Sequence, residues 1–215
     1  MTLLSHPSGV TFMWRHATKS PLPRVWDYCR EDIRSRESPV AGTARKITVV
    51  GDPVLATPCQ PVTEFDAGLA ALIDDMFASM YAADGVGLAA PQIGVSLNVF
   101  VYDCRDAEDR RHVGHIVNPE VVSTSGPIDN GEEGCLSVPG PFHELARPWV
   151  ATVRGVNRTG TPIEVTGTGY FARCLLHEAE HLRGILFIDH LPRNRRRRVL
   201  REMEPFAWNA PVPSP

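Results

Sequence analysis

The sequence predicts an α+β protein in which a mostly antiparallel sheet packs around a central helix and a further helix follows at the C-terminus. Two segments, 69–81 and 171–182, carry apolar residues at the helical period. Between them lie short runs rich in β-branched and aromatic residues, separated by polar turn residues. A charged helical pattern over 192–208 follows the second helix and accounts for the predicted C-terminal helix.

The first helix has clear ends. Asp66 is expected to cap its N-terminus, and Gly85 lies just beyond its last apolar residue. Residues 105–112 are expected to form a polar hairpin tip, residues 118–119 a turn within the next strand, and residues 158–160 the connection between the last two strands. The strands or extended segments that we expect cover residues 47–55, which a turn at 51–53 closes, 97–104, 115–125, 149–157, 161–169 and 186–191.

Composition excludes several classes of protein. No apolar run approaches the roughly 18 residues of a membrane span, and the N-terminus lacks the apolar core of a secretory signal. The five cysteines are widely spaced and contain no C-x-x-C, which argues against a disulfide framework and a structural zinc knuckle and favours a reducing compartment. We therefore expect no membrane association and a cytoplasmic protein in preference to an organellar one.

Charge is distributed unevenly along the chain. The net charge is −3, yet residues 1–46 hold eight Lys or Arg against four Asp or Glu, and residues 193–204 hold six Arg against two Glu. The intervening body is therefore at −11. Contacts with a polyanion are expected at the ends of the chain, and the run Arg195 to Arg198 is either a solvated helix face or a contact for nucleic acid.

The second helical segment contains His177-Glu178-Ala179-Glu180-His181, an H-E-x-x-H sequence, and Gly184 is placed to end that helix. Histidines four positions apart project from one helix face, so both imidazoles can bind one metal ion. Glu178 follows the first histidine closely enough to exchange a proton with a metal-bound water. It also falls inside the apolar stripe, where a carboxylate is costly unless it is paired or near a cation.

A catalytic site of this kind needs a third protein ligand. Phe187 stands six positions after His181, where the long metzincin pattern has histidine, so that class is excluded. Glu202 would suit a peptidase with a downstream glutamate ligand. Cys135 is the other candidate, because a thiolate with two imidazoles suits zinc or ferrous iron. Residue spacing leaves this choice open.

Three stretches in order, GVGLAAPQIG, EGCLS and HEAEHLRG, resemble the signature motifs of the peptide deformylase family. The resemblance implies that Cys135, His177 and His181 bind one divalent metal ion, ferrous iron in the native enzyme with zinc, nickel or cobalt as substitutes. It implies a catalytic domain over 46–207, preceded by an irregular or partly helical extension over 1–45, with a possible short helix at 25–37, and followed by a Pro-rich tail over 208–215.

The resemblance also implies the reaction, which removes the N-formyl group from formyl-methionyl nascent polypeptides and releases formate. Glu178 would act as the acid and base, and Gln92 with the backbone N–H of Leu136 would bind the oxyanion. Gly87 would pair with the substrate backbone. An amide at Gln92 in a stretch of small residues is suited to this task independently of the resemblance.

The methionine side chain needs an apolar slot, for which Val86, Leu136 and Cys174 are the candidates. Two positions depart from the family pattern: Leu176 replaces the usual Gln and Glu180 the usual Asp. We expect Glu180 to pair with Arg147 or Arg173. The competing hypotheses are a metallopeptidase with Glu202 as ligand and a non-catalytic paralogue that docks on ribosomes; the sequence does not indicate an oligomeric state.

Overall fold

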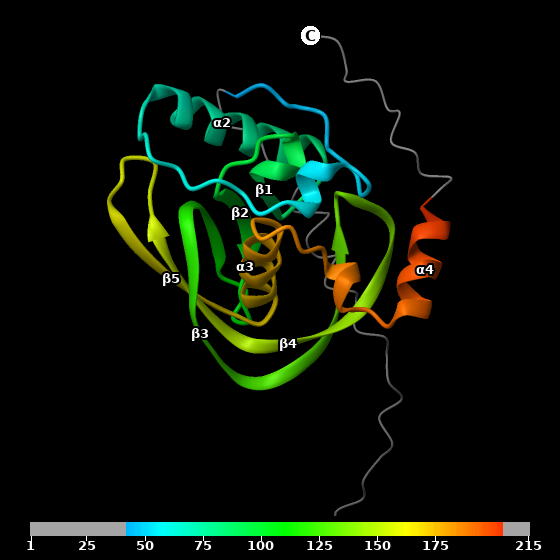
Figure 1. The fold of residues 1–215 in the computed structure, drawn as a ribbon. Helices are drawn as coiled ribbons and strands as arrows, with labels where there is room; N and C mark the ends of the chain where they lie inside the picture. The colour runs from blue at the N-terminus through cyan, green and yellow to red at the C-terminus, as the bar shows by residue number, and fades with distance from the viewer. Residues whose placement is uncertain (1–41, 204–215) are drawn as a thin grey trace, which may run out of the picture.

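The computed structural model describes residues 42–203, which form three α-helices around one five-stranded sheet (Figure 1). The predicted α+β class is confirmed. The α-helices are α2 (Ala67–Ala82), α3 (Gly169–His181) and α4 (Arg193–Glu202), and the strands are β1 (Gly87–Ala89), β2 (Val99–Arg105), β3 (Arg111–Cys135), β4 (Val138–Val156) and β5 (Pro162–Thr168). Three short 3-10 helices lie between them: η1 (Pro53–Ala56), η2 (Ala90–Ile93) and η3 (Phe187–His190).

The sheet has the order β1-β2-β3-β4-β5, and every neighbouring pair is antiparallel. The long strands β3 and β4 curve around α3, while α2 lies beyond β1 and β2 (Figure 1). Side chains alternate along β2 accordingly. Val99 and Val101 pack with α2, whereas Phe100, Tyr102 and Cys104 pack with α3. Because both faces of this strand are covered, its apolar run is continuous.

The predicted start of α2 is confirmed, because the Asp66 side chain accepts a hydrogen bond of 3.0 Å from the Leu69 N–H. Its buried face includes Ile73, Met76 and Met80, each with no exposed surface. The predicted end of α3 is also confirmed. Gly184 adopts a φ of 73°, a left-handed conformation that glycine takes without strain, directly after the last turn.

Strands β3 and β4 extend well beyond the predicted segments. The turn predicted at 118–119 is wrong: Asn118 has a φ of 50° and sits at an irregularity inside β3, where its side-chain amide exchanges two 2.9 Å hydrogen bonds with the Val62 backbone. These bonds hold the irregularity within the strand without reversing the chain. The long hairpin that results ends at Cys135 and Val138.

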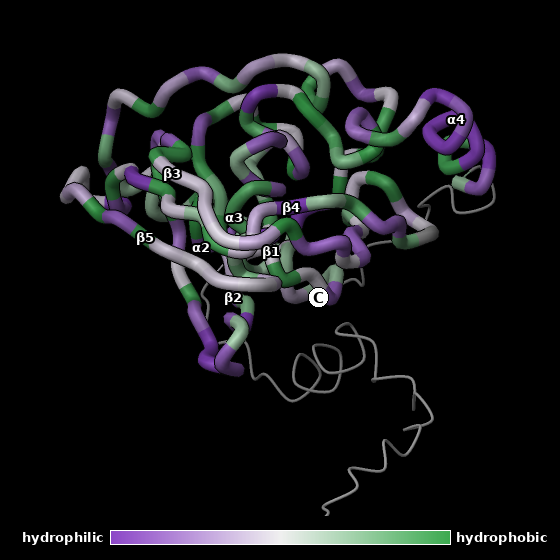
Figure 2. The backbone as a smooth tube through the Cα atoms, turned by 90° about the horizontal axis from the view of Figure 1, so that it is seen from below, coloured by the Kyte–Doolittle hydropathy of each residue, from purple (hydrophilic) through white to green (hydrophobic). Residues whose placement is uncertain are grey.

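The strand or extended segment predicted at 186–191 is also wrong, because residues 187–190 form η3. The Asp189 side chain accepts from the Leu186 N–H at 2.9 Å and closes a tight turn. Helix α4 begins as predicted, lies at one edge of the fold and is mostly hydrophilic (Figure 2). Its predicted continuation over 204–208, the C-terminal tail and nearly all of the N-terminal extension, including 25–37, lie outside the described residues.

None of the helices within residues 42–203 combines the length and the apolar character that crossing a bilayer requires.

Candidate metal centre

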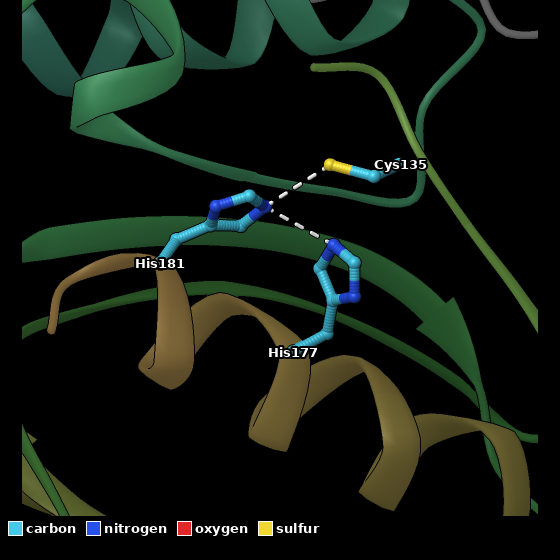
Figure 3. A group of neighbouring side chains, drawn as sticks. All are labelled: Cys135, His177 and His181. Carbon is cyan, nitrogen blue, oxygen red and sulfur yellow. Dashed lines mark hydrogen bonds between the residues drawn. The ribbon is translucent and has the colours of Figure 1, made fainter. Parts of the chain in front are cut away.

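Three potential ligand atoms converge where the β3–β4 hairpin meets α3 (Figure 3). His177 and His181 lie one turn apart on α3, and Cys135 is the last residue of β3. Nε2 of His181 is 3.1 Å from Nε2 of His177 and 3.2 Å from Sγ of Cys135. All three atoms lie within 4.8 Å of one another. Side chains 46 positions apart in the sequence therefore meet at one point.

The donor set fits a divalent metal ion. A tetrahedral ion about 2.0–2.3 Å from each ligand would separate the ligand atoms by about 3.3–3.8 Å, close to the 3.1 and 3.2 Å between Nε2 of His181 and the other two ligand atoms. One thiolate and two imidazoles form a set suited to zinc or ferrous iron. Among the described residues, Oε2 of Glu178 is a buried oxygen without a hydrogen-bond partner, and it belongs to the residue directly after His177. A water on the ion would supply the partner that this oxygen lacks.

His177 is held from behind by a buried carboxylate. Its Nδ1 lies 2.7 Å from Oε1 of Glu133, which leaves Nε2 free to face the centre. Burial disfavours the Glu133 carboxylate, but hydrogen bonds from His177 and Arg147 hold the pKa of Glu133 well below its usual range. Burial likewise opposes a charged His177, yet hydrogen bonds to Cys135 and Glu133 raise its pKa above the ordinary value. Burial and the neighbouring His177 lower the pKa of His181.

Glu178 faces the opposite wall of the centre, which is formed by β1. The Cβ that an alanine would carry at Gly87 would lie 2.8 Å from Cδ of Glu178 and 2.9 Å from Sγ of Cys174. Backbone and carboxylate are thus in direct contact. Burial raises the pKa of Glu178 to about 7, so the carboxyl group can both accept and return a proton near neutral pH.

Gln92 lies in η2 and is almost fully buried. Its Oε1 accepts from the Ala89 N–H at 2.8 Å, which leaves Nε2 to donate to Ser137 Oγ at 3.3 Å and to approach Cys135 Sγ at 3.6 Å. Leu136 follows Cys135 in the hairpin turn, so its backbone N–H is covalently next to the thiolate residue. Two potential oxyanion donors therefore border the same ligand.

The three candidates for the methionine slot do not pack as one group. Cys174 and Val86 share a core cluster, with Sγ of Cys174 3.7 Å from the Val86 carbonyl. The Leu136 side chain packs instead with the cluster around α2, and its Cδ1 lies 2.8 Å from the Cβ position of Gly85. Val86 directly precedes β1, in which Leu88 packs into one cluster and Ala89 into the other, so β1 lies between these two apolar groups.

The other ligand candidate, Glu202, does not join the centre. It accepts a 2.6 Å hydrogen bond from Nε of Arg198 on α4. The predicted pairing of Glu180 is confirmed: Arg147 donates to its two carboxylate oxygens at 2.7 and 2.8 Å, whereas Arg173 binds Glu133 and Asp129.

Sequence reasoning missed three residues around the centre: Glu133, Ser137 and His190. Glu133 is two positions before Cys135 on β3, but the strand is irregular between these residues, so the alternation of a regular strand would not have indicated its role. Ser137 and His190 carried no signal either, because their contacts come from the hairpin turn and from η3.

An H-E-x-x-H helix enclosed by a curved antiparallel sheet, with a thiolate from a strand end beside both imidazoles, defines a metal-dependent hydrolase. Residues 44–197 match the Polypeptide deformylase family. The chain belongs to this family, and it is accordingly a metal-binding hydrolase of protein biosynthesis.

Individual relatives agree with this assignment. Peptide deformylase 1 of Streptomyces avermitilis is 53% identical over 178 residues, which cover 80% of this chain and 82% of the relative. The crystal structure of a peptide deformylase from Legionella pneumophila has a TM-score of 0.71 at 46% identity and covers 76% of this chain and 95% of its own. The crystal structure of peptide deformylase from Ehrlichia chaffeensis in complex with actinonin has a TM-score of 0.72 at 32% identity. It covers 77% of this chain and 99% of its own.

Proposed function

We propose that this chain removes the formyl group from formyl-methionine at the N-terminus of nascent polypeptides, with Cys135, His177 and His181 as ligands of a ferrous ion. The observation that carries the proposal is the meeting of Sγ and the two Nε2 atoms beside the buried, unpartnered oxygen of Glu178. When bound, the ion supplies a Lewis acid that makes water a stronger acid and polarises the formyl carbonyl.

The residues around the centre divide the remaining work. Glu178 takes the proton of the attacking water, and its buried position against Gly87 keeps bulk water from competing for that proton. The oxyanion accepts hydrogen bonds from the Gln92 side-chain amide and the Leu136 backbone N–H; losing one such donor typically costs about a hundredfold or more in rate. Glu178 then gives the proton to the leaving amine, so that formate and a free N-terminus remain.

The substrate binds along β1 in this proposal. Gly87 lets β1 lie directly against Glu178 and Cys174, because a side chain at this position would occupy their space, and the peptide pairs with the backbone of Gly87. The methionine side chain lies against Val86 and Cys174, which share one core cluster, whereas Leu136 packs in the other cluster and contributes its backbone N–H to the oxyanion.

The decisive experiment measures formate release from formyl-Met-Ala-Ser by protein prepared anaerobically, since a ferrous ion beside a thiolate is lost or oxidised in air. Wild-type protein should release formate, and Glu178→Ala should lose nearly all activity while keeping its metal. A metal-loaded wild-type protein that releases no formate would leave the non-catalytic hypothesis standing.

A pair of ligand variants tests the metallopeptidase alternative. Cys135→Ser should sharply reduce bound metal, whereas Glu202→Gln should leave it unchanged because Glu202 pairs with Arg198. The reverse result would make Glu202 the ligand. Metal analysis of anaerobic protein identifies the native ion, and iron should predominate.

We further propose that α4 contacts ribosomal RNA in the bacterial cytoplasm. Residues 193–198 are all exposed, and α4 contains six arginines and one glutamate. If four arginines each neutralise a phosphate, affinity should fall on the order of 100-fold between 50 and 200 mM salt. Ribosome co-sedimentation of wild type and of a variant with Arg195 to Arg198 changed to Gln tests this; equal, weak binding by both at every salt concentration would refute it.

A further inference from the structure

A continuous series of ionic contacts leads from the metal centre to the protein surface. It starts at Nδ1 of His177, which lies 2.7 Å from Glu133. Arg147 donates to both oxygens of Glu133 at 2.8 and 3.0 Å and to both oxygens of Glu180 at 2.7 and 2.8 Å. Nε2 of His190 lies 2.9 Å from Oε2 of Glu180 and forms the outer end of the series.

Four members of this series are buried, His177 among them, and only the last reaches solvent. The side chains of Arg147, Glu133 and Glu180 are 7%, 4% and 11% exposed, whereas that of His190 is 37% exposed. Buried charges require close pairing, because removal of one partner leaves an uncompensated charge. One guanidinium here serves two carboxylates, so the position of Arg147 depends on both of them.

The two carboxylates are secured differently at their far sides. Glu133 has a second cation, because Nη1 of Arg173 donates to it at 3.2 Å and is itself anchored by the Leu145 carbonyl at 2.7 Å. Glu180 has His190 in the corresponding place. Since a carboxylate only accepts hydrogen bonds, Nε2 of His190 donates the proton. His190 therefore completes the support of Arg147 on the side where Arg173 cannot reach.

We propose that His190 is a positioning residue of the metal centre, acting on the His177 ligand through Glu180, Arg147 and Glu133. The contact with His190 fixes the orientation of the Glu180 carboxylate. Arg147 then keeps its hydrogen bonds to both Glu180 and Glu133, and Glu133 directs Nε2 of His177 at the ion. Partners outside the ligand shell commonly change metal affinity 10- to 100-fold, because they fix the orientation of the ligand ring. The inference rests on the proposed metal centre and adds to it a surface residue that controls metal retention.

The chain offers a matched control pair. Nε2 of His112 lies 2.8 Å from Oδ2 of Asp106, and the His112 side chain is 34% exposed, so the chemistry and exposure resemble those of His190 with Glu180. Asp106 lies in the β2–β3 turn and His112 is the second residue of β3, where its ring also stacks on Phe171 of α3 at 4.5 Å; neither belongs to the ionic series. Loss of this pair reports the general effect of removing a histidine–carboxylate contact.

The experiment measures how fast cobalt- or zinc-loaded protein releases its metal to a chelator, together with the visible absorption of the cobalt form. His190→Ala should release metal about tenfold faster or more and shift the cobalt spectrum. His190→Gln, whose side-chain amide can donate to Glu180, should restore a rate near that of wild type. His112→Ala should stay within about twofold of wild type even if its melting temperature falls.

A double-mutant cycle tests whether His190 acts through Glu180. In a Glu180→Gln background, adding His190→Ala should bring little further change if the two residues form one unit. A wild-type release rate and spectrum in His190→Ala would overturn the inference, as would an equal acceleration in His112→Ala. If wild-type protein binds no metal, both the proposed function and this inference fail. If wild-type protein binds metal and releases formate, the proposed function holds, and the variants then test the role of His190 alone.

Discussion

Replacing Gly87 with alanine should disable catalysis without removing the metal. The new Cβ would lie 2.8 Å from Cδ of Glu178 and 2.9 Å from Sγ of Cys174. Carbon atoms in contact normally stay about 3.5–4.0 Å apart, so Glu178 must move by roughly 1 Å. Glu178 and Cys174 are both buried, which leaves them no solvent into which to retreat.

A displacement of about 1 Å at a reacting group costs on the order of 100-fold in rate, so kcat/KM of Gly87→Ala for formyl-Met-Ala-Ser should fall by about that factor or more. Metal content should stay near that of wild type, because no ligand atom is among the three nearest neighbours of the new Cβ. Formate release and metal analysis on the same preparation provide both values.

Gly68→Ala is a suitable control, since Gly68 lies in the first turn of α2 and its three nearest neighbours are all atoms of the Asp66 side chain, the closest an oxygen at 3.2 Å. That variant should keep wild-type kcat/KM. A Gly87→Ala enzyme with wild-type kcat/KM would refute the close contact between β1 and Glu178. Loss of metal in this variant would show that the substitution disturbs the ligands and not the acid–base residue.

Three further predictions concern stability and metal binding. Leu176→Ala should lower the unfolding free energy by about 2 kcal/mol or more in urea denaturation, because the buried Leu176 packs against Ala151, and unchanged stability would contradict that packing. Burial opposes the charge of Asp106, but hydrogen bonds from His112, Arg110 and the Glu108 backbone lower the pKa of Asp106 below its ordinary value. The contribution of Asp106 to stability should therefore be complete above about pH 4, near the unfolded pKa, and vanish as the pH falls through the folded pKa. The stability gap between wild type and Asp106→Asn should therefore shrink in acid; a gap independent of pH would exclude this linkage. Glu133→Gln should lower the unfolding free energy by about 3 kcal/mol or more, because the buried Arg147 loses its paired carboxylate. The variant should also release metal readily, because the carboxylate that orients His177 is gone. Tight metal binding in this variant would contradict the support of His177 by Glu133.

Local sequence patterns were sufficient to predict the helices and two of the three metal ligands. The spacing of His177 and His181 places both imidazoles on one face whatever surrounds the helix, since a helix repeats every 3.6 residues. The Asp66 cap and the left-handed Gly184 follow from backbone chemistry within a few residues of each helix end. The short polar tips between strands were recognisable for the same reason.

The third ligand and its supporting charges depended on contacts between distant segments. Glu133 meets His177 across 44 positions, and Arg147 meets Glu180 across 33, because β3 and β4 continue as a paired hairpin past several register irregularities. Nothing local reveals how far two strands stay paired, since each hydrogen bond of the ladder needs its partner strand. Periodicity thus specified which residue types face one another along a single element, whereas the packing of the hairpin against α3 and η3 determined which thiolate, carboxylates and surface histidine complete the centre.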